Sequence, residues 1–111
     1  MIDSKNMPKL GFGLMRLPEN DGVIDMAQVC EMVDAYMKKG FNYFDTAYVY
    51  HGGKSETVVK EAITRRYPRE SFYVATKLPA WEMSGSEDRD RIFEEQLSRC
   101  GVDYFDFYLL H

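Results

Sequence analysis

The feature that most constrains the fold is an alternation of helical and strand-like segments that repeats along the whole chain. The strand-like segments contain Phe41, Phe72 and Phe105, which lie 31 and 33 residues apart. This spacing is typical of a strand, a crossover helix and a second, parallel strand. With the apolar segment 9–15 as a first strand, residues 1–111 have the order β-α-β-α-β-α-β. Because such crossovers are right-handed, the sequence predicts a parallel sheet covered by helices.

Local signals set the ends of the predicted helices. Asp25 is the expected N-cap of the first helix, with Gln28 as its reciprocal capping partner, and Gly40 ends that helix. Ser55 is expected to cap the second helix, and Gly101 to end the third. Apolar residues at helical spacing form the predicted buried faces: Val29, Met32, Val33, Tyr36 and Met37; Val58, Val59, Ala62 and Ile63; Ile92, Phe93, Leu97 and Cys100.

Size and charge exclude several classes of protein. A chain of 111 residues and 13.0 kDa is one domain at most. Eighteen acidic and fourteen basic residues give a net charge of −4, and the basic residues are scattered rather than clustered. Since nucleic-acid binding usually requires a basic patch, the sequence predicts no nucleic-acid partner.

The cysteines and the apolar runs point to a cytoplasmic setting. Cys30 and Cys100 lie far apart, with no C-x-x-C motif and no histidine at metal-ligand spacing, so we expect two buried thiols and no metal site. The first nine residues contain no apolar core of signal-peptide length. Nowhere do about 18 apolar residues run together, which predicts no membrane span.

Four polar residues fall at equivalent places in the predicted sheet. Asp45 closes the second strand, Lys77 the third and His111 the fourth, while Tyr50 lies in the loop after Asp45. The carboxyl ends of parallel strands meet at one edge, so these side chains are expected to converge there. This placement favours a (β/α)8 barrel, which carries its chemistry at that rim. A doubly wound sheet would instead bring a nucleotide to a glycine-rich first turn.

Two glycine-rich segments offer alternatives. Gly11 and Gly13 begin a possible dinucleotide-binding turn, but Arg16 stands where the fingerprint needs its third glycine or alanine. The segment 53–55, Gly-Lys-Ser, is similar to the end of a phosphate-binding loop. Tyr48 occupies the position of that loop's first glycine, where its side chain would obstruct a phosphate. A phosphate-binding domain using Gly53, Lys54 and Ser55 remains an alternative.

Four separated motifs, in order, resemble those of the aldo-keto reductases. They are GFGLMRLP (11–18), NYFDTAYVYHGGKSE (42–56), VATKLP (74–79) and DFYLLH (106–111). The resemblance implies a (β/α)8 TIM-type barrel of which residues 1–111 form the N-terminal half, and NADPH-dependent reduction of a small carbonyl substrate. It places the catalytic tetrad of that family on Asp45, Tyr50, Lys77 and His111.

The resemblance also implies a role for each residue. Tyr50 would give a proton to the carbonyl oxygen, and Lys77, with its ammonium beside the Tyr50 oxygen, would favour the phenolate. Asp45 would keep Lys77 charged, and His111 would orient the carbonyl or help to relay the proton. The resemblance further assigns Gly13, Leu14 and Asp45 to the cofactor and Trp81 to the substrate pocket. Independently of it, Tyr48 is expected to pack or to line the pocket rim, and His51 to face solvent in the loop.

Length limits what the chain is expected to do by itself. A complete barrel takes about 250 residues, and the groups that clamp the cofactor in the family come largely from later strands. We therefore expect residues 1–111 to be an inactive fragment whose open sheet edges favour pairing with the remainder of the barrel or with a second copy. A non-catalytic module that senses NADPH is the other alternative.

Overall fold

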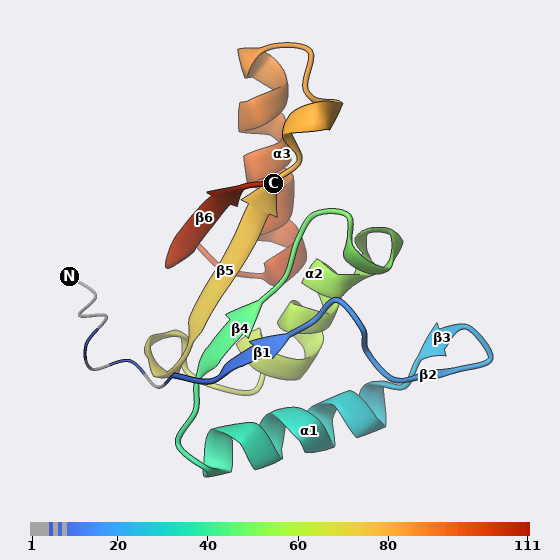
Figure 1. The fold of residues 1–111 in the computed structure, drawn as a ribbon, viewed down its shortest axis with the longest axis vertical. Coiled ribbons are helices and arrows are strands. Elements are labelled where there is room, and N and C mark those ends of the chain that lie inside the picture. Colours follow the sequence, from blue (N-terminus) through green and yellow to red (C-terminus); the bar gives the residue numbers. More distant parts are fainter. Residues whose placement is uncertain (1–4, 6, 8) are drawn as a thin grey trace.

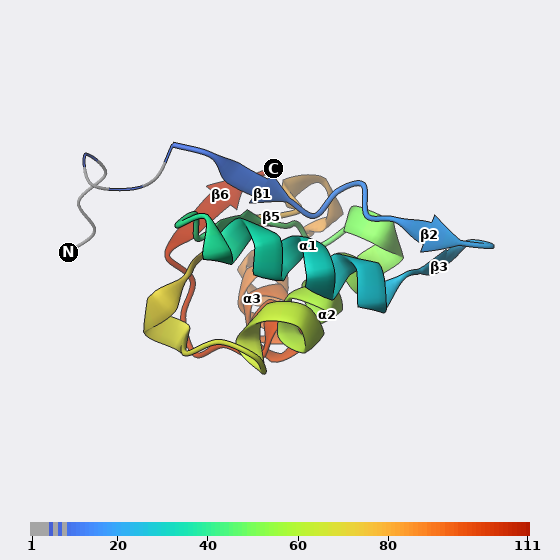
Figure 2. The ribbon, with the colours of Figure 1, turned by 90° about the horizontal axis from the view of Figure 1, so that it is seen from below.

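The computed structural model describes residue 5, residue 7 and residues 9–111, and its centre is a four-stranded parallel sheet with the order β1-β4-β5-β6 (Figure 1). The predicted β-α-β-α-β-α-β order is confirmed. The strands are β1 (Gly11–Gly13), β4 (Tyr43–Asp45), β5 (Tyr73–Leu78) and β6 (Phe107–Leu110), and the helices are α1 (Met26–Lys38), α2 (Lys54–Val59) and α3 (Ser86–Cys100). Figure 2 shows all three helices on one face of the sheet.

Several shorter elements were not predicted. A two-stranded antiparallel hairpin, β2 (Glu19–Asn20) with β3 (Val23–Ile24), lies between β1 and α1. A π-helical turn, Lys60–Thr64, continues α2, and 3₁₀ turns occur at Tyr50–Gly53, Arg69–Ser71 and Ala80–Glu82. The hairpin projects beyond the sheet next to the start of α1 (Figure 1).

The parallel register sets which residues share a strand-end position. Gly13 pairs with Asp45, Asp45 with Ala75, and Lys77 with Leu109. Side chains alternate across each strand, so Phe44 faces the helices whereas Asp45 faces the opposite side. This opposite side, away from the three helices, is called the open face below.

The core lies between the sheet and the helices. Phe44 is fully buried, and its ring lies 5.3 Å from the Tyr36 ring and 6.2 Å from the Phe72 ring. Most of the predicted helix faces are buried, but Met32 is exposed and Cys30 is only half-buried. On α3 the predicted buried face omits Gln96, which is completely buried although it is polar.

The ends of α1 follow the prediction in part. Asp25 is the N-cap, and its carboxylate accepts a hydrogen bond of 3.1 Å from the Gln28 backbone N–H. The reciprocal half of the predicted capping box is wrong, because the Asp25 N–H donates to the Pro18 carbonyl at 2.8 Å. Gly40 and Gly101 follow α1 and α3 with φ angles of 91° and 68°, as glycines that end helices do.

The described residues include no helix whose length and apolar character would let it cross a membrane. The prediction that the chain begins without a signal-peptide core concerns residues 1–9, which lie mostly outside the described part of the chain.

Candidate active site

Lys77 and Asp45 form an ion pair at the carboxyl ends of neighbouring strands. Asp45 is the last residue of β4, and the Lys77 Nζ donates to its Oδ2 at 2.9 Å and to the Thr46 carbonyl at 2.8 Å. The Lys77 side chain is 15% exposed and the Asp45 side chain 33%. Because Lys77 is largely removed from water, the carboxylate compensates its charge and fixes the direction of its ammonium.

Tyr50 and His111 reach the same rim. Tyr50 begins the 3₁₀ turn after β4, and its ring centroid lies 4.7 Å from the Lys77 Nζ and 6.0 Å from the His111 ring. The His111 backbone N–H donates to the Leu78 carbonyl at 2.9 Å, which holds this residue beside β5. The structure therefore brings the four predicted residues together. The lysine faces the phenol ring in a cation–π contact, whereas the sequence analysis placed it beside the phenol oxygen.

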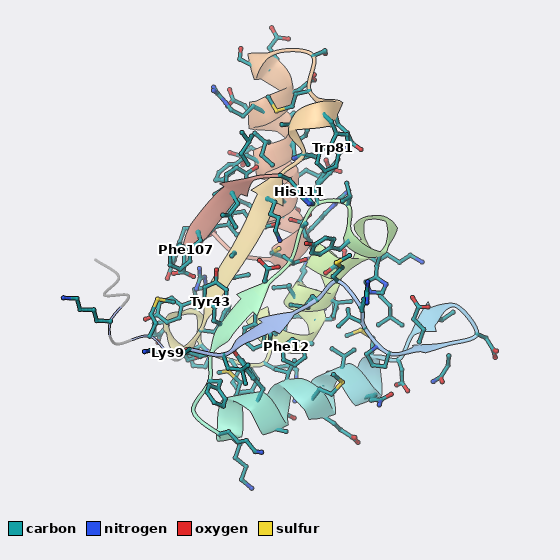
Figure 3. All side chains as sticks on the ribbon, in the orientation of Figure 1. Lys9, Phe12, Tyr43, Trp81, Phe107 and His111 are labelled. Carbon is teal, nitrogen blue, oxygen red and sulfur yellow. The ribbon has the colours of Figure 1, made fainter. Side chains whose placement is uncertain are left out.

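Trp81 is the fifth side chain at this rim. Its ring lies 4.9 Å from the His111 ring, and the residue is 58% exposed. Figure 3 shows the two side chains next to each other where β5 and β6 end. Trp81 is therefore placed to contact a molecule that approaches His111.

The end of β1 offers space next to Asp45. A Cβ atom added at Gly13 would meet no atom of the described residues within 4 Å. Leu14 is fully buried, and its backbone N–H donates to the Asp45 carbonyl at 2.8 Å. Its carbonyl accepts from the Ser55 hydroxyl at 2.8 Å. The backbone of Leu14 is thus already hydrogen-bonded, and the free surface at this strand end lies over Gly13.

Ser55 is not the predicted helix cap, because its hydroxyl bonds groups at the strand ends instead. The helix α2 begins at Lys54 after Gly53, and Ser55 lies in its first turn with no exposed surface. Its hydroxyl lies 2.7 Å from the Thr46 hydroxyl and also bonds Leu14, so it joins the ends of β1 and β4 to α2. A buried and fully bonded hydroxyl has no capacity to bind a phosphate, which removes the support for a phosphate-binding loop.

His51 is also placed differently from the prediction. Its side chain is 12% exposed, and its Nε2 accepts a hydrogen bond of 3.0 Å from the Leu17 backbone N–H. Its Nδ1 lies 3.2 Å from a carboxylate oxygen of Glu19. The solvent-facing assignment was wrong, because this loop residue ties the Tyr50 turn to the segment that follows β1.

Tyr48 packs on α3 rather than on the open face. Its hydroxyl donates to Glu95 at 2.7 Å, and its ring lies 4.2 Å from the Arg99 guanidinium. The hydrogen bond to Glu95, together with burial, raises the pKa of Tyr48 above its ordinary value. Of the two roles predicted for Tyr48, packing is the one that the contacts support.

Glu56 is a buried carboxyl group that the sequence analysis missed. It has no exposed surface, and its Oε2 accepts from the Thr76 hydroxyl at 2.8 Å. Its Oε1 lies 3.3 Å from the Arg99 Nη1. Burial raises the pKa of Glu56, and the bonds from Thr76 and Arg99 oppose this shift only in part.

The raised pKa predicts how the stability depends on pH. The folded chain holds the Glu56 proton more tightly than the unfolded chain does. The resulting stabilisation is therefore complete below about pH 4.5, the ordinary pKa of a glutamate, and is lost as the pH rises through the folded-state pKa. The free energy of unfolding of the wild type, relative to that of Glu56→Gln, should therefore fall as the pH rises from 4.5. Urea denaturation of both chains across this range measures it. A relative stability that rises with pH would contradict the assignment.

Within the described part of the chain, no three His, Cys, Asp or Glu side chains are grouped so that they could hold a metal ion. The residues at the rim instead supply one carboxylate, one ammonium, one phenol and one imidazole, carried by parallel βα units. This arrangement is typical of barrel folds, in which functional sites lie at the carboxyl ends of the strands.

Comparisons with known proteins identify the family. The model of the aldo/keto reductase family matches residues 9–111, and the chain belongs to this oxidoreductase family. An aldehyde reductase of Saccharomyces cerevisiae is 34% identical over 108 residues, which are 96% of this chain and 30% of that protein. An aldo-keto reductase of Mycolicibacterium smegmatis is 32% identical over 98% of this chain and 36% of its own length.

Solved structures support the same fold. A Klebsiella pneumoniae aldo-keto reductase in complex with NADPH superposes with a TM-score of 0.80 and 31% identity, over 95% of this chain and 35% of that one. The thermostable aldo-keto reductase Tm1743 gives a TM-score of 0.78 and 28% identity, over 95% of this chain and 38% of that one. The chain thus has the fold of the N-terminal part of a (β/α)8 barrel, as predicted, and spans about a third of the length of its relatives.

Proposed function

We propose that residues 1–111 supply the catalytic side chains of a barrel that reduces an aldehyde or ketone to an alcohol with NADPH. The observation that carries the proposal is the position of the Lys77 ammonium, which is bonded to Asp45 and lies 4.7 Å from the centroid of the Tyr50 ring. The names of the relatives support it, since the yeast protein is an aldehyde reductase and the Klebsiella structure contains NADPH.

The reaction requires a hydride at the carbonyl carbon and a proton at the oxygen. Bound NADPH would supply the hydride. Tyr50 donates its hydroxyl proton to the carbonyl oxygen, where negative charge develops. The positive charge of Lys77 stabilises the phenolate that remains, and Asp45 holds the ammonium in position through the ion pair of 2.9 Å.

His111 and Trp81 define the substrate side of this site. The His111 imidazole donates a hydrogen bond to the carbonyl oxygen, which fixes the angle at which the carbonyl group meets the Tyr50 hydroxyl. Trp81 lies against His111 with the two rings at 66° and keeps much of its surface exposed, so it forms an apolar wall beside the reacting carbon. A small aldehyde or ketone fits this combination of one polar anchor and one aromatic wall.

The end of β1 would hold the nicotinamide end of the cofactor. Gly13 leaves the space next to Asp45 open, while the fully buried Leu14 anchors this strand end in the core. Asp45 lies level with Gly13 in the sheet register. The pyrophosphate and adenosine groups need further binding residues, which would come from the rest of the barrel. Residues 1–111 by themselves are therefore expected to show no turnover.

A chimeric barrel tests this function. Residues 1–111 replace the matching segment of the Saccharomyces cerevisiae aldehyde reductase, and NADPH oxidation is followed at 340 nm with an aromatic aldehyde. We expect oxidation that depends on the aldehyde, and none with the 111-residue chain alone. If NADPH quenches the Trp81 fluorescence of the folded chimera but no aldehyde is reduced, the proposal is wrong and the NADPH-sensing module is favoured.

A further inference from the structure

The loop that carries Tyr50 has an unusual backbone and needs support from outside. It connects β4 to α2, and His51, Gly52 and Gly53 have φ angles of 53°, 62° and 95°. A residue other than glycine is strained at such an angle, so His51 keeps this conformation only where its surroundings hold it. The position of the Tyr50 ring therefore depends on what holds residues 46–53 in place.

The Arg99 side chain holds this loop from behind, on the helix side of the sheet. Its Nη1 donates to the Tyr48 carbonyl at 3.2 Å, and its guanidinium plane lies 4.2 Å from the centroid of the Tyr48 ring. It also lies against Gly53, where an added Cβ atom would come within 3.4 Å of the Arg99 Nη2. Arg99 thus lies beside residues on both sides of Tyr50.

The same guanidinium is fixed by two carboxylates. Its Nη1 lies 3.3 Å from the Glu56 Oε1, and its Nη2 donates to Glu95 at 3.1 Å. Glu56 is fully buried on α2, and Glu95 lies one turn before Arg99 on α3. Figure 1 shows α2 and α3 side by side behind the sheet, so the arginine is held between these two helices.

This cluster continues to the strand that carries Lys77. The second carboxylate oxygen of Glu56 accepts from the Thr76 hydroxyl at 2.8 Å, and Thr76 directly precedes Lys77. The buried Gln96 donates to the Lys77 carbonyl at 2.8 Å and to the Thr76 hydroxyl at 3.3 Å. One network of buried and half-buried polar groups therefore joins the backbone next to Tyr50 with the backbone of Lys77.

We propose that Arg99 is a positioning residue of the active site, which uses its contacts with Tyr48, Gly53 and Glu56 to hold the Tyr50 ring over the Lys77 ammonium. The proposal rests on the proposed function of Tyr50 and Lys77 as reacting partners. A lysine cannot replace Arg99, because only the planar guanidinium makes several directed hydrogen bonds and stacks on an aromatic ring at the same time.

The test measures the position of the two side chains and needs no turnover. In the 111-residue chain with labelled lysine and tyrosine, NMR detects the nuclear Overhauser effect between the Lys77 ε-protons and the Tyr50 ring, and the upfield shift that the ring gives those protons. We expect both signals in the wild type and their loss in Arg99→Lys and Arg99→Met, with a dispersed amide spectrum retained. Arg89→Met is the matched control, an exposed arginine on the same helix paired with Asp90 at 3.4 Å, and it should keep both signals.

Each outcome decides the proposal. Retention of both signals in the folded Arg99→Lys and Arg99→Met chains would overturn it, and so would the collapse of the amide spectrum in both, since Arg99 would then be needed for folding rather than for position. The chimeric barrel separates this inference from the proposed function. If the wild-type chimera is active, Arg99→Lys should lower kcat by up to about 100-fold, the effect of a displacement of about 1 Å, with an unchanged Kd for NADPH. If that chimera is inactive, the NMR result still stands alone.

Discussion

Tyr50→Phe is expected to lower kcat of the chimeric reductase by about 10²–10⁴-fold, the usual contribution of a positioned general acid. The substitution removes the hydroxyl and keeps the ring. The ring contacts with the Lys77 ammonium at 4.7 Å and with His111 at 6.0 Å should therefore persist. The loss should appear in kcat with an aromatic aldehyde, whereas the Kd for NADPH, measured by fluorescence titration, should change little.

Tyr48→Phe is the matched control, because it removes a phenol hydroxyl from the same loop. That hydroxyl donates to Glu95 on the helix side of the sheet, away from the proposed substrate. The ring that packs on Arg99 remains, so kcat of Tyr48→Phe should stay close to that of the wild type. Full activity in Tyr50→Phe, or an equal loss in both variants, would show that Tyr50 is not the proton donor.

The convergence of the four rim residues could be predicted because it follows from topology alone. Helices that alternate with strands force the strands to be parallel, and parallel strands end at one edge. Asp45 and Lys77 therefore had to be neighbours once each was placed at the end of its strand, and the ion pair of 2.9 Å is the result. The same argument placed His111 and the loop of Tyr50 without any knowledge of side-chain contacts.

The support behind the rim could not be predicted in this way. Ser55 bonds a residue 41 positions away, and His51 bonds one 34 positions away. Neither contact leaves a periodic pattern in the sequence, and a serine after glycine is typical of a helix cap. Glu56 and Gln96 are polar residues on helices, a pattern that indicates exposure. Both are nevertheless buried, because each forms a hydrogen bond with the buried Thr76 hydroxyl.

Asp106→Ala, at the opposite end of the sheet, should lower the free energy of unfolding by about 1.5–3 kcal/mol, the contribution of hydrogen bonds to a charged group. The Asp106 Oδ2 accepts from the Val74 backbone N–H and from Arg69, both at 2.8 Å. The Asp106 and Arg69 side chains are only 9% and 18% exposed. The alanine variant leaves the Val74 backbone N–H without its acceptor and the Arg69 guanidinium without its carboxylate partner, although Arg69 keeps its bonds to the Phe72 and Tyr104 carbonyls. Urea denaturation measures the effect.

Asp90→Ala is the control for this experiment, since Asp90 also pairs with an arginine but is 76% exposed, and its loss should cost at most about 1 kcal/mol. Equal effects of the two substitutions would contradict a structural role for Asp106.

The position of Asp106 explains why its effect should reach the active site. It directly precedes β6 and binds the second residue of β5, so it fixes the relative height of the two strands. Lys77 and His111 lie at the other ends of those strands, and a slip at the first end would separate them at the rim.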